Sequence, residues 1–217
     1  MINTNTIARA TVIIAAFTLL SKILGFVREM AMAYVFGASA ATDAYLVAYT
    51  VPNILFAILG GALVVVAVPV FSAYAVEGKK SEAWKVFSIF STILGLALLL
   101  LIIISLPFSR HIVWLMAPGL PEDTALLAAE LVEVMLPVVL FYSFANLFSG
   151  LLNANNIFGP PAFWPVVNNI FIIASILLGF KFGITGVAVG ALTGNIAAVV
   201  IQVPYLFRAG FVFRPSL

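Results

Sequence analysis

The sequence predicts an all-α polytopic membrane protein with about six transmembrane helices, and composition, apolar segment length and loop charge all support this class. Of the 217 residues, 64% are hydrophobic and 8% are charged, and the mean hydropathy is +1.22. A soluble domain carries about 25% charged residues. The chain has no cysteine, so disulfides, zinc–thiolate sites and thiol nucleophiles are excluded. Its net charge of +2 is too small to indicate nucleic acid as a partner.

Six apolar segments are long enough to cross a bilayer, which takes about 20 apolar residues. Charged residues and clusters of glycine and proline separate these segments from one another. The expected spans are 7–36, 43–74, 84–106, 125–152, 162–180 and 183–207. Together they form one transmembrane domain over residues 1–217.

The breaks can be justified in chain order. Residues 37–39, Gly-Ala-Ser, end the first span, and the second contains Pro52-Asn53, Gly60-Gly61 and Pro69. Prolines predict kinks, and paired glycines predict close helix contact. A polar connection over residues 107–124 precedes the fourth span, which contains Pro137. Asparagines and the Gly-Pro-Pro of residues 159–161 precede the fifth span.

The first span could also be a signal peptide, because Arg9 and the apolar residues 10–20 resemble its first two regions. Residues 31–33, Ala-Met-Ala, resemble a cleavage site. Charged residues lie between the apolar run and this site, however, and the apolar pattern resumes after them. We therefore interpret the segment as a retained first helix.

Loop charge predicts the orientation in the membrane. An even number of spans puts both termini on one side, together with the loops over residues 77–85 and 153–161. That side carries six cations against two on the other: Arg9, Lys79, Lys80, Lys85, Arg208 and Arg214 against Arg110 and Lys181. Positive charge favours the cytoplasmic side, so both termini are expected in the cytoplasm.

Residues 21–29, Ser-Lys-Ile-Leu-Gly-Phe-Val-Arg-Glu, place three charges inside the first span. A charged residue at a helix centre costs about 2.5–3.5 kcal/mol on insertion scales. At helical spacing Lys22, Arg28 and Glu29 form one wide polar stripe, with Ser21 on its flank. We expect this stripe to face an open, water-filled groove with its cations ready for an anionic substrate. The alternative is internal pairing, in which Glu29 or Asp43 neutralises a cation as a packing device.

Two further polar residues accompany the stripe. Asp43 stands at a predicted helix N-terminus, where an N-cap or first-turn acid is the simpler interpretation. Asn53 follows Pro52 in mid-span, where transporters often break a helix beside the substrate cavity, although a plain kink is nearly as good an explanation. Nothing in the sequence resembles a catalytic set, and His111 has no companion at metal-ligand spacing. We therefore expect neither an enzyme nor a metal or cofactor.

Four motifs follow one another in the first two spans. They are the nine residues 21–29, Phe-Gly-Ala at 36–38, Thr-Asp-Ala-Tyr at 42–45 and Val-Pro-Asn at 51–53. This string resembles the start of the MurJ (MviN) family, the lipid II flippases of the MOP exporter superfamily. The match continues through Gly61-Ala62, Val68-Pro69, Leu152-Asn153, Phe158, Pro161-Ala162-Phe163, Pro165 and Asn169.

The resemblance implies the N-terminal six-helix lobe of a MOP-type, MATE-like carrier in the bacterial inner (cytoplasmic) membrane. Such a carrier moves lipid II, an anionic polyprenyl-pyrophosphate glycan used for peptidoglycan, from the inner to the outer leaflet by alternating access. Coupling to the membrane potential or to a monovalent cation is possible. The C-terminal lobe is absent, so the chain is expected to be a fragment or to pair with a separate half.

The resemblance also assigns residues. The family's basic position matches Lys22, its Arg-acid pair matches Arg28-Glu29, and its Thr-Asp-Ala aspartate matches Asp43. With Ser21 and Asn53, these residues form the predicted substrate-binding set.

One departure keeps other functions open. Many family members carry an arginine shortly after Pro-Asn, but residues 53–57 contain no charge. A Wzx-like flippase for polysaccharide units is therefore an alternative. A MATE-like multidrug/cation antiporter should rely on embedded carboxylates, whereas this stripe has two cations and one acid. A non-transporting membrane scaffold would leave the charged stripe as an unexplained cost.

Overall fold

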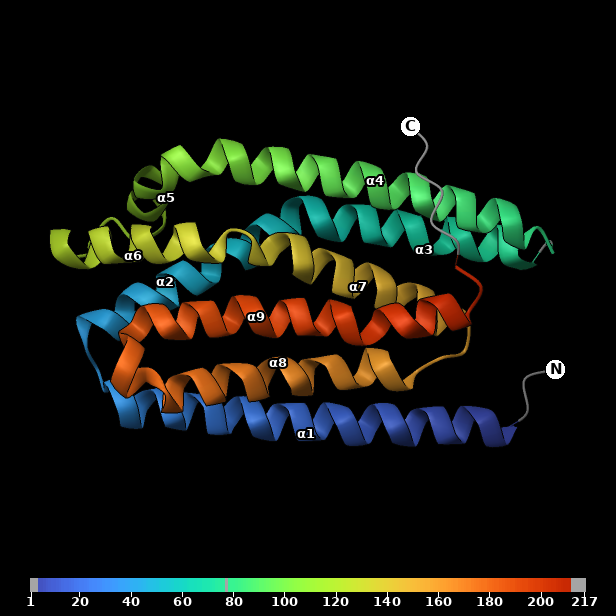
Figure 1. The fold of residues 1–217 in the computed structure, drawn as a ribbon, viewed down its shortest axis with the longest axis horizontal. Helices are drawn as coiled ribbons and strands as arrows, with labels where there is room; N and C mark the ends of the chain where they lie inside the picture. Colours follow the sequence, from blue (N-terminus) through green and yellow to red (C-terminus); the bar gives the residue numbers. More distant parts are fainter. Residues whose placement is uncertain (1–3, 77, 212–217) are drawn as a thin grey trace.

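The structure, a computed structural model, describes residues 4–76 and 78–211, which form helices joined by short turns (Figure 1). The α-helices are α1 (Thr4–Phe36), α2 (Ala40–Leu55), α3 (Gly61–Val76), α4 (Lys80–Ser105), α5 (Ser109–Met116), α6 (Glu122–Met135), α7 (Val138–Ala154), α8 (Gly159–Leu177) and α9 (Gly179–Arg208). A π-helical turn, η1 (Phe56–Gly60), joins α2 to α3, and a 3-10 turn, η2 (Leu106–Phe108), joins α4 to α5. No strand occurs in the described ranges, which confirms the all-α prediction.

The long helices lie side by side, and the chain crosses the bundle back and forth (Figure 1). Within the described ranges, five helices are long and apolar enough to cross a membrane, and the bent pair α6–α7 counts as a sixth span. This agrees with the predicted class of about six spans.

The second pass consists of α2, η1 and α3, and it is irregular at the π-helical turn and not at its prolines. Pro52 lies inside α2 and Pro69 inside α3. Gly60 ends the π turn, and a Cβ there would collide with the Ser143 side chain of α7 and with the ring of Phe56. Because only glycine leaves this space free, α7 can approach the second pass closely at this point.

Two later passes are broken at single residues. α6 and α7 meet at an angle of 44° across Pro137, which cannot donate a backbone hydrogen bond and crowds the preceding turn. In α9 the non-helical residue is Gly183, with φ 62° and ψ −162°. Glycine adopts positive φ without strain, so the helix changes direction there. The expected start of the last span, at residue 183, coincides with this break.

The predicted polar connection over residues 107–124 is largely helical, because it contains α5 and the first turn of α6. Ser109 and Val113 of α5 are buried. The Ser109 Oγ donates a hydrogen bond of 2.9 Å to Glu133 Oε1, which ties α5 to α6.

Helix α1 lies at the edge of the bundle and packs mainly along α8 (Figure 1). Its outward residues, such as Val12, Leu19 and Phe26, are exposed, whereas the interior of the bundle is closely packed. The largest fully buried side chains are Phe87, Leu94, Leu98, Leu131, Met135, Leu136, Leu147, Leu151, Leu152, Ile172, Ile176 and Leu206. One side of α1 is therefore open to lipid or to another helix bundle.

The start of α1 and the end of α9 lie at the same end of the bundle as the end of α3, the start of α4 and the α7–α8 loop (Figure 1). Lys79, Lys85 and Arg208 belong to this end through the start of α4 and the end of α9. Arg110 in α5 and Lys181 in the first turn of α9 belong to the opposite end. Glu77 and Arg214, which entered the sequence-based topology, lie outside the described residues.

Candidate functional site

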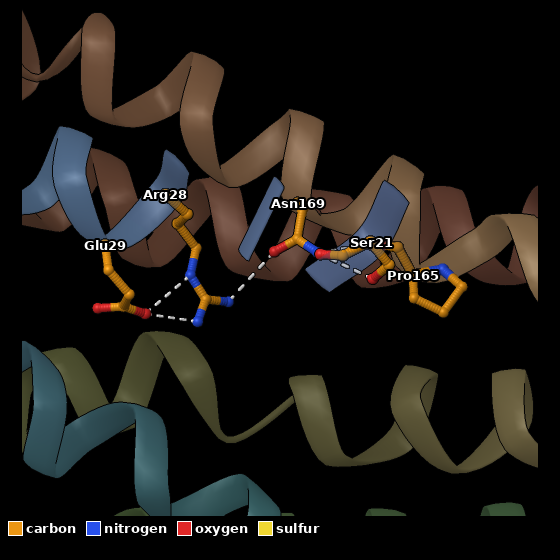
Figure 2. A network of polar contacts seen from close by, with 5 residues as sticks. All are labelled: Ser21, Arg28, Glu29, Pro165 and Asn169. Carbon is orange, nitrogen blue, oxygen red and sulfur yellow. Dashed lines mark hydrogen bonds and ion pairs between the residues drawn. The ribbon is translucent and has the colours of Figure 1, made fainter. Parts of the chain in front are cut away.

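The charged stripe lies in the middle of α1, beside α8. α1 is continuous through residues 21–29, since Gly25 is the one weak helix former in this segment. The helical repeat therefore fixes the positions of Lys22, Arg28 and Glu29 relative to one another. Figure 2 shows Arg28 and Glu29 of α1 and Asn169 of α8 pointing to the same side of the two helices.

Arg28 is held by three neighbours. Its Nη2 and Nε donate to Glu29 Oε1 at 2.6 Å and 3.2 Å (Figure 2). Its Nη1 donates to Asn169 Oδ1 at 3.4 Å. Its guanidinium carbon lies 5.5 Å from the centroid of the Tyr49 ring, within cation–π range. The internal pairing weighed as an alternative is therefore present at Arg28, which is half-buried, while Glu29 stays exposed.

Asn169 joins α8 to the stripe. Its Nδ2 lies 3.3 Å from both the carbonyl oxygen and the Oγ of Ser21, and 3.0 Å from the carbonyl oxygen of Pro165 in its own helix. Its Oδ1 accepts from Arg28. The predicted binding set omitted this residue, which entered only as part of the family string. An amide in an apolar span was the available signal, because polar groups in membranes seek partners on other helices.

Lys22 lies in a different environment. It is exposed and lines a cavity of about 410 Å³ between α1, α7 and α8. The other polar residues of the lining are Thr18, Ser21, Asn146, Ser149 and Asn153. Its ammonium group has no hydrogen-bond or ion-pair partner within residues 4–76 and 78–211. Among the described residues that line it, Lys22 is the one ionisable group, so the cavity presents a positive charge among neutral donors and acceptors.

A second, much smaller cavity adjoins Arg28. Arg28, Glu29 and Met32 of α1 line it together with Tyr45, Leu46 and Tyr49 of α2, and its volume is about 20 Å³. This space is enough for about one water molecule. A large ligand therefore fits beside Lys22 and not beside Arg28 in this conformation.

Asp43 and Asn53 lie apart from these contacts. Asp43 is exposed in the first turn of α2, and Ser39 is the N-cap, accepting from the Thr42 backbone N–H at 3.4 Å. The carboxylate is therefore a first-turn acid, placed where the helix dipole favours it. Asn53 donates from Nδ2 to the Tyr49 carbonyl oxygen of its own helix at 2.8 Å. The structure does not bring either side chain into contact with Lys22 or Arg28.

The chemistry that these residues can perform is binding. Within the described ranges, no group of three or more histidine, cysteine, aspartate or glutamate residues is arranged to hold a metal ion. A cation in the wall of a polar cavity suits an anionic group with hydroxyl or amide neighbours. A bundle of about six apolar spans with a cationic, polar cavity in its wall has the architecture of a polytopic membrane protein with a binding site for an anionic ligand.

The family follows from comparison of the sequence. The family model described as "Lipid II flippase MurJ" matches residues 32–217, so the chain belongs to this family. The probable lipid II flippase MurJ of Buchnera aphidicola subsp. Acyrthosiphon pisum is 34% identical over an alignment of 212 residues, which covers 94% of this chain and 41% of that protein. The lipid II flippase MurJ of Burkholderia cenocepacia is 31% identical, with the same coverage of 94% and 41%.

Solved structures show the same fold. A lipid II flippase MurJ in an inward closed conformation matches with a TM-score of 0.79 and 29% identity, covering 94% of this chain and 43% of that one. A MOP superfamily transporter from Pyrococcus furiosus matches with a TM-score of 0.73 and 19% identity, over 95% of this chain and 48% of that one. The chain thus spans about 41% of the length of the curated relatives named above.

Proposed function

We propose that this chain forms the N-terminal lobe of a flippase that moves lipid II from the inner to the outer leaflet by alternating access. The observation that carries the proposal is Lys22, a cation of the long apolar helix α1 that lines a polar cavity and has no ion-pair partner among the residues that the structure describes. In this proposal its ammonium group contacts the pyrophosphate of the lipid-linked glycan. The second lobe, from the rest of the gene product or from a partner, closes the other side of the cavity.

The remaining residues of the predicted set take supporting roles. Arg28 adds positive potential and is oriented by Glu29 and Asn169, while Ser21 connects the stripe to α8. Asp43 and Asn53 belong to α2 and are not among the described residues that line the Lys22 cavity, so the proposal gives them no direct contact with the substrate.

We place both termini in the cytoplasm of a bacterium, with the protein in its inner membrane. The excess of cations at the terminal end of the bundle supports this orientation. With this topology, charges on α1 lie within the transmembrane potential, which is worth about 2.3 kcal/mol per charge per 100 mV. Coupling to the potential or to a monovalent cation is therefore part of the proposal.

One observation favours a second substrate class. Residues 53–57 carry no charge, and the Lys22 cavity is lined by neutral polar groups that suit many glycans. A Wzx-like flippase for another lipid-linked polysaccharide unit is therefore the second candidate.

The test is made in a bacterium depleted of its own lipid II flippase. The full gene product is expressed, and an impermeant enzyme that cleaves the pyrophosphate bond measures the lipid II exposed on the outer leaflet. We expect the wild-type protein to restore exposure and Lys22→Ala to lower it at least about tenfold, since loss of a charged partner costs about 1.5–3 kcal/mol. Lys181→Ala, which removes an exposed cation outside the cavity, should have no effect.

A wild-type protein that leaves lipid II unexposed would contradict the proposal. Export of a different polyprenyl-linked glycan by the same protein would support the second candidate. Equal amounts of exposed lipid II with Lys22→Ala and with the wild type would show that Lys22 does not take part in substrate binding.

A further inference from the structure

We propose that a cavity between α5 and α6 binds the head group of a zwitterionic phospholipid, with Arg110 holding the phosphate and Glu122 the ammonium group. The cavity has a volume of about 390 Å³ and is lined by Arg110, His111, Trp114, Glu122, Ala125 and Leu126. Helices α5 and α6, which line it, lie at the end of the bundle opposite the start of α1 and the end of α9 (Figure 1), and the cavity shares no lining residue with the Lys22 cavity.

The position of α5 indicates the membrane interface. Ser109 and Val113 pack inward, whereas Trp114 and Leu115 are 68% and 77% exposed. A short helix with one apolar face buried and further apolar side chains exposed is typical of a segment that lies in the head-group region. Tryptophan is enriched at this level of the bilayer. The cavity therefore opens where lipid head groups are the abundant ligands.

The charges of the cavity select the kind of head group. Arg110 and Glu122 are exposed and line the same space, but they form no ion pair with each other. Neither side chain has another hydrogen-bond or ion-pair partner in the part of the chain that the structure describes. A ligand with only negative charge would satisfy Arg110 and be repelled by Glu122. A phosphate joined to an ammonium group satisfies both, and His111 offers the phosphate a further donor.

The lining of the cavity combines charged and apolar residues, as a phospholipid combines a charged head group with apolar chains. Glu122 stands at the outer end of α6, and Ala125 and Leu126 follow one turn deeper in the bundle. Trp114 stands one turn beyond Arg110 in α5. In this proposal the charged residues surround the head group, and the exposed side chains of Trp114 and Leu126, which line the same cavity, contact the start of the acyl chains. A soluble phosphate ester lacks these chains and leaves the apolar surface uncovered.

The test uses native mass spectrometry of the purified full gene product, with phosphatidylethanolamine or phosphatidylglycerol of identical chains. We expect phosphatidylethanolamine to bind with a dissociation constant about tenfold lower than phosphatidylglycerol. Arg110→Gln and Glu122→Gln should each raise that constant about tenfold, and Glu122→Gln should also remove the preference between the lipids. Lys181→Gln and Asp123→Asn are matched controls, because they remove exposed charges at the same end but outside the cavity lining.

Several outcomes would overturn the proposal. These are equal binding of the two lipids by the wild type, unchanged binding in both cavity variants, or the same loss in the controls. A competition experiment with soluble glycerophosphoethanolamine distinguishes the lipid from its free head group. At equal concentration this compound should displace less than about a tenth of the bound phosphatidylethanolamine. Full displacement would show a site for the free head group and not for the lipid. Unchanged unfolding temperatures of the variants separate lost binding from lost folding, and the result is independent of flippase activity.

Discussion

At the scale of single residues, the two cations of α1, Lys22 and Arg28, have different surroundings. Arg28 is held by Glu29, Asn169 and the Tyr49 ring, so its geometry is fixed before any ligand arrives. Lys22 lines the cavity of about 410 Å³ and has no hydrogen-bond or ion-pair partner in the described part of the chain. A bound anion can therefore take Lys22 without breaking an existing contact, whereas taking Arg28 means competing with Glu29.

This difference predicts that exchanging lysine and arginine is tolerated at position 22 and is harmful at position 28. Lys22→Arg should keep at least about half of the flippase activity, because the cavity has room and no fixed geometry has to be matched. Arg28→Lys should lose activity severalfold, since an ammonium group cannot reproduce the planar fork that reaches Glu29 and Asn169 together. Lipid II exposure on the outer leaflet measures both variants. The reverse order of the two activities would contradict this division of roles.

Asn169 carries a prediction about stability. Asn169→Leu removes the hydrogen bonds to Ser21 and Arg28 and should lower the free energy of unfolding by about 0.6–1.7 kcal/mol, the range of interhelical hydrogen bonds in membranes. Asn53→Leu is the matched control, because the Asn53 side chain bonds to a carbonyl oxygen of its own helix and, among the described residues, to no other helix. Reversible unfolding in mixed micelles measures both. Equal losses in the two variants would show that the contact between α1 and α8 contributes nothing.

At the scale of elements, the sequence predicts where the helices span the membrane, but it does not predict which helices pack against one another. Apolar length gives the passes, and the irregularities at Pro137 and Gly183 follow from backbone chemistry that can be read locally. In the second pass the sequence predicts kinks at Pro52 and Pro69, but both prolines lie inside helices, and the observed irregularity is the π turn Phe56–Gly60, which ends at the glycine pair. Gly60 leaves the space that the Ser143 side chain of α7 occupies, a tertiary contact that the local sequence does not reveal.

The same limit applies to the site. Periodicity on α1 was enough to predict that Lys22, Arg28 and Glu29 share a stripe. It could not show that α8, distant in sequence, is the main neighbour of α1, and so Asn169 was omitted from the predicted set. The grouping of Asp43 and Asn53 with the stripe was a family expectation, and the structure leaves these residues on α2 without contact to it.

The packing of α8 on α9 depends on a glycine. A Cβ at Gly190 would collide with the Ser175 side chain of α8, whereas a Cβ at Gly25 of α1 would meet nothing within 4 Å. We expect Gly190→Val to lower the free energy of unfolding by about 1–3 kcal/mol through overpacking. Gly25→Ala should be neutral or raise it by up to about 1 kcal/mol, because alanine is the better helix former. Unfolding curves in one detergent compare the two, and equal stability of both variants would contradict close α8–α9 packing.

At the scale of the whole molecule, most helices are packed around a shared core, whereas the α1 side of the bundle is not covered by other helices that the structure describes. The core is packed between α2, α4, α6, α7 and α9, while α1 has its neighbours mainly on the α8 side. Helix α1, which bears the charged stripe, is therefore also the helix least covered by the rest of the chain. Its exposed apolar residues and its polar stripe together suit a second lobe that meets this edge, as the proposed flippase requires.

The whole-molecule prediction concerns topology, and the cysteine-free sequence makes it simple to test. Ser81→Cys lies in the first turn of α4 at the terminal end, and Gly119→Cys lies between α5 and α6 at the opposite end; both positions are exposed. Because cations favour the cytoplasmic side, an impermeant maleimide added to spheroplasts should label Gly119→Cys. Ser81→Cys should react only after permeabilisation. Labelling of Ser81→Cys in intact spheroplasts would show that the protein has the opposite orientation. In that case the proposed substrate would enter the Lys22 cavity from the other leaflet.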